Sequence, residues 1–150
     1  MTDYTIRRMD KSDTAKLAEL DSVCFSMPWS EQSFAEEAEN ELAAYFVAAS
    51  QNGILGYIGC WRVIDEGHIT NVAVAPDFRR NGIASALLER IIREANENNL
   101  VLLTLEVRKS NFAAQKLYES FGFKPLGERK AYYHSPCEDA VIMTLMLGEN

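Results

Sequence analysis

The middle of the chain carries a strand pattern, an amphipathic helix pattern and a second strand pattern in direct succession. The two strand segments, GHITNVAV at 67–74 and LVLLTLEV at 100–107, are rich in β-branched and aliphatic residues. Between them, apolar residues recur at the three- and four-residue intervals of one helix face, at Ala84, Leu87, Leu88, Ile91 and Ala95. Because the second segment is apolar almost throughout its first half, we expect a strand with a parallel neighbour and helices over both faces.

The flanking segments predict the rest of an α/β fold. Asn52-Gly53 readily takes the positive φ values of a tight turn, so it predicts a hairpin. Further strands are expected at 4–8, 43–50, 54–65, 124–134 and 138–147, and further helices at 12–25, 27–40 and 110–123. Candidate caps for these helices are Ser12 or Asp13, Ser30, and Ser110 or Asn111. We therefore predict one domain over residues 1–150, with a mixed central sheet of about seven strands and helices on both faces.

Charge, hydropathy and cysteine spacing argue against several classes of function. The chain has 15 Lys and Arg against 22 Asp and Glu, and the net charge of −7 disfavours direct nucleic-acid binding and favours a basic partner. No apolar run approaches the roughly 20 residues of a membrane span. The N-terminus lacks the apolar stretch of a secretory signal, so we expect a cytoplasmic protein without membrane contact. Cys24, Cys60 and Cys137 form no CxxC pair and lie near no histidine cluster, so we expect structural thiols and no metal site.

The segment RRNGIAS, residues 79–85, combines two arginines with a glycine at the start of the predicted central helix. A helix N-terminus exposes unpaired N–H groups and carries about half a positive charge, so it attracts phosphate. Gly82 lets a ligand approach the backbone closely, and Ala84 keeps the next surface small. Arg79 and Arg80 add cationic donors. The segment matches neither the GxGxxG dinucleotide pattern nor the GKS/T phosphate loop. It predicts a pyrophosphate site, with a solvated turn as the alternative.

Together with its neighbours, this segment resembles a family signature. NVAVAPDFRRNGIASALL, residues 71–88, resembles the acetyl-coenzyme A motif of the Gcn-five-related N-acetyltransferase (GNAT) superfamily, in which a VAV-type strand runs through P-x-x-R-x-x-G-x-G/A into a helix. The segments MPWSEQSF, HITNVAV, LEVRKSNFAAQKLYESFGF and RKAYYHSPCEDAVIMTL look like the bacterial RimI type, the ribosomal-protein-alanine N-acetyltransferases. The one departure is Ala84, where many relatives carry a second glycine and where a methyl group should still fit.

The resemblance implies a GNAT fold, acetyl-CoA as cosubstrate and no metal. It implies that the coenzyme pyrophosphate is bound beside Arg79 by main-chain amides, at Arg80, Asn81, Gly82, Ile83, Ala84 and Ser85. Val72, Ala73 and Val74 would pair with the extended pantetheine arm as another strand would. Asn111 and Tyr118 match further coenzyme contacts, although Asn111 can equally be only a helix cap.

Transfer of an acetyl group from a thioester to an amine needs a base and an acid. Glu106 lies between apolar residues in the strand LEV, where partial burial would raise its pKa toward that of a general base. A salt bridge to Arg108 or Lys109 is the alternative. Tyr118 lies in the following helix, which can return it to the same end of the sheet, and its reference pKa of about 10 is near that of a thiol, about 8.5. Tyr118 could otherwise belong to the core. The resemblance implies Glu106 as the base and Tyr118 as the acid.

Candidate groups can also be named for stabilising the oxyanion and for relaying protons. The Val74 N–H is our candidate for the oxyanion, because the family strand here carries a bulge and splays from its neighbour. His68 could relay a proton or line the acceptor site, or it could simply be hydrogen-bonded. Since no cysteine or serine has an ordered His/Asp partnership, direct attack by the amine is favoured over a covalent intermediate.

Reference pKa values favour an N-terminal amine as the acceptor. The pKa is about 7.7–8.0 for an α-amino group and about 10.4 for lysine, so roughly a tenth of N-termini are neutral at pH 7 against under a thousandth of lysines. The resemblance implies the N-terminal alanine of the eighteenth small-subunit ribosomal protein, whose start is basic, with Tyr132 and Tyr133 covering the peptide. Acidic side chains that could receive it, or could simply be solvated, are Glu31, Glu36, Glu37, Glu39, Glu138 and Asp139.

Two other functions stay open at this point. A small-amine or polyamine acetyltransferase would better fit a closed acidic pocket than an open groove between PWSEQSF and AYYHSPCED. A non-catalytic acyl-CoA sensor would bind the coenzyme without turnover. The presence of both Glu106 and Tyr118 argues against that sensor, because binding alone needs neither a base nor an acid.

Overall fold

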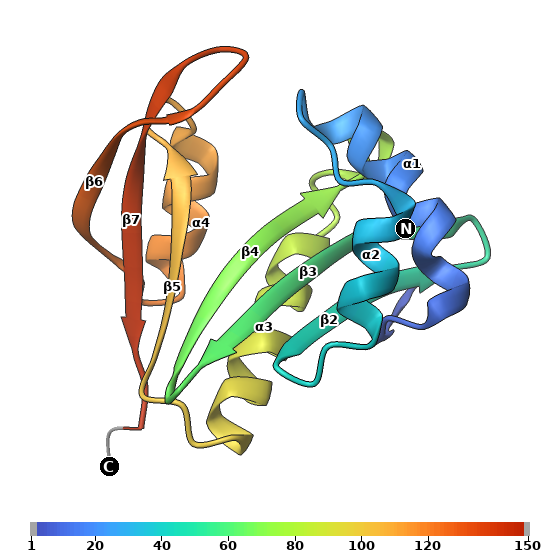
Figure 1. Cartoon of the computed structure of the whole chain (residues 1–150), viewed down its shortest axis with the longest axis horizontal. Coiled ribbons are helices and arrows are strands. Elements are labelled where there is room, and N and C mark those ends of the chain that lie inside the picture. Colours follow the sequence, from blue (N-terminus) through green and yellow to red (C-terminus); the bar gives the residue numbers. More distant parts are fainter. Residues whose placement is uncertain (1–2, 149–150) are drawn as a thin grey trace.

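One mixed seven-stranded sheet forms the centre of the structure, a computed structural model that describes residues 3–148 (Figure 1). The strands are β1 (Thr5–Arg8), β2 (Ala43–Ser50), β3 (Gly53–Val63), β4 (Glu66–Val74), β5 (Leu102–Arg108), β6 (Lys124–Tyr133) and β7 (Glu138–Met146). They lie in the order β1-β2-β3-β4-β5-β7-β6. β4 and β5 are parallel, whereas the other neighbouring strands are antiparallel.

Two pairs of helices cover opposite faces of this sheet. The helices are α1 (Thr14–Cys24), α2 (Glu31–Ala38), α3 (Ile83–Glu97) and α4 (Phe112–Ser120), with short 3-10 turns at Lys11–Asp13 and Pro76–Phe78. α1 and α2 bury Leu17 and Phe34 against Tyr57 of β3. On the other face, α3 and α4 belong to one cluster with Leu103 and Leu105 of β5. The predicted α/β class, mixed sheet and helices on both faces are therefore confirmed.

The starts of the helices follow the predicted caps with one exception. The side chain of Ser30 caps α2, and the side chain of Asn111 caps α4. Asp13, one of the two candidates for the first helix, holds the N-cap position of α1, but its side chain makes no capping hydrogen bond there. Asp10 instead accepts the Ser12 N–H and begins a 3-10 turn that leads into α1.

The strand β5 is covered differently from the prediction. Leu103, Leu105 and Val107 are buried, whereas the residues that alternate with them are less completely buried. The expectation of helices over both faces of this strand is wrong, because α1 and α2 pack over β2, β3 and β4 instead. Alternate side chains of β5 consequently stay available for a site.

β4 and β5 pair at one end and then separate, as Figure 1 shows. Their register ends with His68 opposite Thr104. At the closed end, the Val101 N–H donates to the main-chain oxygen of Asp65 at 2.7 Å. Beyond His68, the second half of β4 has β3 as its partner on one side and an opening on the other.

A bulge in β4 lies just beyond the point where the strands separate. The register between β3 and β4 shifts at Thr70, between the pairs Cys60–Ile69 and Gly59–Asn71. One extra residue reverses the face to which the following side chains point. The side chain of Ile69 accordingly packs in the α3 cluster, whereas Asn71 points to the α1 face.

The described residues also bear on membrane spans, metal clusters and cysteines. No helix within residues 3–148 combines the length and apolar character of a membrane span. Over the same residues, no three or more His, Cys, Asp and Glu side chains are grouped so that they could hold a metal ion. Cys24, Cys60 and Cys137 are free thiols.

Candidate active site

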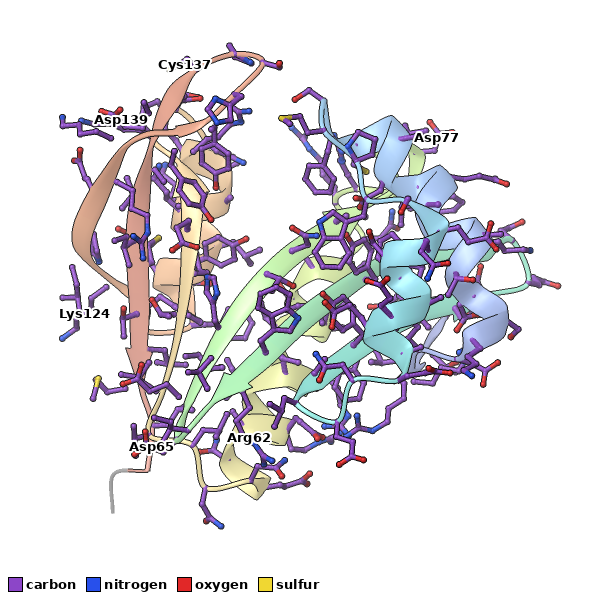
Figure 2. The ribbon with its side chains drawn as sticks, in the orientation of Figure 1. Arg62, Asp65, Asp77, Lys124, Cys137 and Asp139 are labelled. Carbon is purple, nitrogen blue, oxygen red and sulfur yellow. The ribbon has the colours of Figure 1, made fainter. Side chains whose placement is uncertain are left out.

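A cleft of about 650 Å³ opens where β4 and β5 separate. One wall is the loop between α1 and α2, residues 25–30, and the opposite wall is the turn between β6 and β7, residues 134–137. Figure 2 shows Asp65 at the closed end, with Asp77 and Cys137 on opposite sides of the open end. α4 also lines the cleft, although it covers the other face of the sheet. Residues from both faces of the sheet therefore line the cleft.

Glu106 lies on the α1 face of β5 and lines this cleft. Only 8% of its side chain is exposed. Its Oε1 atom lies 2.7 Å from Nε2 of His68, and Nε of Arg129 donates to its Oε2 atom at 3.0 Å. The alternative partners pair elsewhere, Arg108 with Glu138 and Lys109 with Glu128. β4 and β6 thus hold the carboxylate of Glu106 from two sides.

These two partners set the charge state of Glu106. The hydrogen bond with His68, reinforced by Arg129, holds the pKa of Glu106 below its usual value, although partial burial acts in the opposite direction. The prediction that burial would raise this pKa is therefore wrong. Glu106 is an ionised carboxylate at neutral pH, so it can accept a proton as soon as an acidic enough donor is placed beside it.

Tyr118 lines the same cleft from the opposite face. It lies in α4, is 8% exposed and packs against Phe123 with ring centroids 5.9 Å apart. Burial raises the pKa of Tyr118 to about 12, so the hydroxyl keeps its proton at neutral pH. Tyr118 was expected to be either a site residue or a core residue. The two positions are compatible, because the ring is part of the core while the residue borders the cleft. A proton acceptor and a proton donor thus flank one opening from its two faces.

The main chain of β4 supplies hydrogen-bonding groups to the opening. The Ala75 N–H donates to the Leu55 oxygen of β3 at 2.7 Å. Because the hydrogen-bonding direction alternates along a strand, Val74 and Val72 direct their N–H and C=O groups away from β3, toward the opening. Ala73 faces β3 with its main chain, and its side chain is buried under α1. A bulged strand that splays from its neighbour was expected here, and both features are present.

The loop before α3 has an unusual backbone conformation. Arg80 and Gly82 have φ values of 66° and 75°. Asn81 braces the loop, since its Nδ2 atom donates to the main-chain oxygens of Phe78 at 2.9 Å and Arg79 at 3.2 Å. Left-handed residues alternating with extended or right-handed ones turn successive N–H groups toward a common point, which suits an anion.

The first turn of α3 continues this row of donors. The first helical hydrogen bond runs from the Ala86 N–H to the Gly82 oxygen at 3.0 Å. The N–H groups of residues 82–85 precede that bond, as in any helix N-terminus. The side chain of Ile83 is buried, so Ile83 can contribute only its main chain, whereas Ala84 and Ser85 are half-buried. The start of α3 thus exposes a row of main-chain donors that could receive an anion.

Arg79 and Asn111 have roles within the fold as well. Nε of Arg79 donates to the Val74 main-chain oxygen at 3.1 Å, which ties the loop to the end of β4. Oδ1 of Asn111 accepts the Ala114 N–H at 3.1 Å, so the helix-cap alternative is confirmed. Asn111 also borders the cleft beside Tyr118, where a ligand could reach it.

Acidic residues at the rim are largely paired within the protein. Glu138 binds Arg108 and accepts the Ser110 N–H. Asp139 pairs with Lys130 at 3.4 Å. Glu39 pairs with Lys11, and the acidic residues of α2 lie away from the cleft lining. These contacts argue against the reception of a basic peptide by Glu39, Glu138 and Asp139, whose charges are balanced within the protein, and by the residues of α2, which do not line the cleft.

Sequence reasoning missed three residues of this site: Arg129, Asp21 and Asn71. Arg129 lies in an exposed strand, where nothing in the pattern distinguishes it from a surface arginine. Asp21 had a signal, since it lies four residues after Leu17 on the buried face of a helix. Asn71 could not be assigned, because its direction depends on the bulge.

Comparisons with known proteins agree with this geometry. A family model described as "Acetyltransferase (GNAT) family" matches residues 14–123. A Bacillus subtilis protein, provisionally named a ribosomal protein bS18-alanine N-acetyltransferase, is 37% identical over 149 residues, which are 99% of each chain. The ribosomal protein bS18-alanine N-acetyltransferase of Escherichia coli K12 is 36% identical over 147 residues, with 96% of this chain and 98% of the relative covered.

Two solved structures are similar over nearly their whole length. The crystal structure of the ribosomal-protein-S18-alanine N-acetyltransferase from Escherichia coli superimposes with a TM-score of 0.88 at 36% identity, covering 99% of this chain and 98% of the other. A chain of the NatC complex bound to Gag peptide and CoA has a TM-score of 0.83 at 26% identity, covering 97% of this chain and 99% of the other.

Proposed function

Because this chain belongs to the Acetyltransferase (GNAT) family, we propose that it transfers the acetyl group of acetyl-CoA to the N-terminal α-amine of a protein. The specific substrate that we propose is the N-terminal alanine of ribosomal protein bS18, on which two similar proteins are named to act. One observation carries the proposal. Residues from both faces of the sheet line the cleft, with Glu106 on one face and Tyr118 on the other.

Residues on the α3 face are suited to acetyl-CoA. The main-chain amides of residues 80–85 would hold the pyrophosphate, where Gly82 leaves open space around its Cα. The main-chain groups of Val72 and Val74 would pair with the pantetheine arm. The Val74 N–H then points toward the region where the thioester oxygen gains charge, as an oxyanion donor must.

Glu106 and Tyr118 supply the proton transfers of direct attack. The attacking nitrogen becomes far more acidic as it bonds to the carbonyl carbon, so even a carboxylate of low pKa can take its proton. Tyr118 donates toward the leaving sulfur. Its pKa of about 12 is higher than that of a free thiol, about 8.5, but the burial that raises it also disfavours a thiolate at the same place.

The acceptor approaches from the α1 face. There the cleft opens between residues 25–30 and the turn at 134–137, with Tyr132 and Tyr133 at its edge. An opening between two loops suits an extended chain end better than a small amine. An N-terminal amine is also easier to deprotonate than lysine, so Glu106 can serve it without a second base.

Mass spectrometry of three acceptors tests the proposed function. The first is a peptide that begins with Ala-Arg, the second is the same peptide with its α-amine blocked and a lysine free, and the third is a polyamine. We expect one acetyl group on the first peptide alone, at its N-terminus. Acetylation of only the lysine or the polyamine would contradict the proposal, and coenzyme binding without turnover on all three would identify a sensor.

The loop before α3 yields a separate prediction through Gly82→Ala. The new Cβ meets no atom within 4 Å, but φ is 75°, so the substitution should cost about 1 kcal/mol of stability. We expect the Kd for acetyl-CoA, measured by calorimetry, to rise about tenfold, because the loop relaxes or the methyl group enters the phosphate site.

Gly53→Ala is the matched control for this variant. Gly53 also has a positive φ, 97°, and open space around it, but it is the first residue of β3, directly after the β2–β3 turn. Both variants should lose similar stability, while Gly53→Ala binds acetyl-CoA as the wild type does. Equal affinity of the two variants would exclude the anion site at the start of α3.

A further inference from the structure

A buried carboxylate lies on the α1 face of the cleft, outside the set of groups that the reaction uses. Asp21 is 1% exposed and belongs to the third turn of α1. Its Oδ1 atom accepts a hydrogen bond from the Tyr57 hydroxyl at 2.6 Å, and its Oδ2 atom accepts the Trp29 N–H at 2.8 Å. No cation is among these partners. Burial raises the pKa of Asp21, so the carboxylate is held there at some cost to the fold.

Asp21 holds the cleft wall at 25–30 from both of its ends. The Phe25 N–H donates to the main-chain oxygen of Asp21 at 2.9 Å, and the Trp29 N–H donates to its carboxylate. Between these two points Met27 projects outward and is 63% exposed. The Trp29 ring rests on Phe34, with centroids 5.4 Å apart. This wall has no hydrogen-bonded secondary structure of its own, so Asp21 is its principal polar anchor.

The same carboxylate is connected to β4 beside the opening. Nδ2 of Asn71 donates to the Tyr57 hydroxyl oxygen at 3.1 Å, and Tyr57 donates onward to Asp21. Asn71 directly follows the bulge at Thr70, and Thr70 is itself 3.0 Å from the Tyr45 hydroxyl. We call the chain Trp29–Asp21–Tyr57–Asn71 the Asp21 network. It joins one wall of the cleft to the strand whose main chain faces the opening.

We propose that Asp21 is a positioning residue for the acceptor peptide, because its network fixes the wall at 25–30 relative to β4 at the opening. The peptide that fits is an extended N-terminal segment that lies between this wall and Tyr132. The proposal rests on the proposed function, which assigns this side of the cleft to the acceptor. It gives a role to a buried carboxylate that lies beside Leu17 and Leu20 on the packed face of α1.

Two variants and one control test the network. Asp21→Asn keeps the shape of the side chain but cannot accept both hydrogen bonds, and Tyr57→Phe removes the link to Asn71 without emptying the core. Asp13→Asn is the control, since Asp13 is also a buried carboxylate near α1, but it pairs with Arg7 away from the cleft.

The readouts are the KM for the acceptor peptide, the Kd for acetyl-CoA and the hydrogen exchange of the Trp29 amide by NMR. In Asp21→Asn and Tyr57→Phe we expect the peptide KM to rise about tenfold and Trp29 exchange to accelerate, with the Kd for acetyl-CoA unchanged. Asp13→Asn should lower Tm and leave the other readouts unchanged.

Unchanged Trp29 exchange and unchanged peptide KM in Asp21→Asn would overturn the inference, as would an equal rise of KM in Asp13→Asn. Failure of the proposed function would be recognised separately, because the wild-type protein itself would then acetylate no peptide. Hydrogen exchange of the Trp29 amide tests whether Asp21 anchors the wall, whether or not the protein acetylates a peptide.

Discussion

Replacing Tyr118 with phenylalanine is expected to lower kcat by about a hundredfold or more, the usual contribution of a positioned general acid. The phenol is buried, borders the cleft and keeps its proton, because burial raises its pKa to about 12. Phenylalanine preserves the packing against Phe123, so the Kd for acetyl-CoA should change by less than about twofold. Steady-state kinetics with an Ala-Arg peptide and calorimetry with acetyl-CoA measure the two quantities.

Tyr4→Phe is the control for this variant, because Tyr4 packs at the edge of the α3 cluster and does not line the cleft. It should retain wild-type kcat. If kcat of Tyr118→Phe stayed within twofold of the wild type, the leaving sulfur would receive its proton from another group.

Replacing Glu106 with glutamine is expected to lower kcat/KM for the peptide by about a hundredfold across the range from pH 6 to 9. Glutamine has the same shape and can still accept from Arg129, but it cannot take a proton from the attacking nitrogen. The rate should fall at every pH in this range, because the wild-type carboxylate is ionised throughout it. Measurement of kcat/KM against pH for both proteins checks this.

The sign of the pKa shift fixes the shape of that profile. The pKa of Glu106 is lowered by His68 and Arg129, so its base function is complete above the ordinary carboxyl pKa of about 4.3 and is lost only as pH falls below that value. A rise in rate between pH 6 and 8 would therefore come from the α-amine of the substrate, whose pKa is about 7.7–8.0. This rise should persist in Glu106→Gln. Its disappearance would show that Glu106 titrates near neutral pH.

Local patterns in the sequence predicted most elements and the glycine turn at the start of α3. Helix periodicity, the caps at Ser30 and Asn111 and the glycine at the start of α3 each act within a few residues, so one stretch of chain carries the whole signal. The resemblance to GNAT enzymes predicted Glu106 and Tyr118 as residues of the site, and both border the cleft.

Interactions between distant strands could not be predicted in the same way. Glu106 forms hydrogen bonds with His68, which is 38 positions away in the sequence, and with Arg129, which is 23 positions away. These contacts lower the pKa of Glu106, whereas burial alone would raise it. The bulge at Thr70 is likewise a property of the register between β3 and β4. The residues missed in the site are those whose direction depends on such pairings.

The central claim is that the acetyl group crosses the sheet between β4 and β5, from a coenzyme on the α3 face to an amine on the α1 face. A crystal structure with a conjugate that joins CoA covalently to an N-terminal alanine peptide tests it most directly. We expect the CoA portion against residues 79–85 and the peptide portion between residues 25–30 and Tyr132, with the joining carbonyl beside the Val74 N–H. A conjugate bound along one face only, without entering the opening between β4 and β5, would contradict the account.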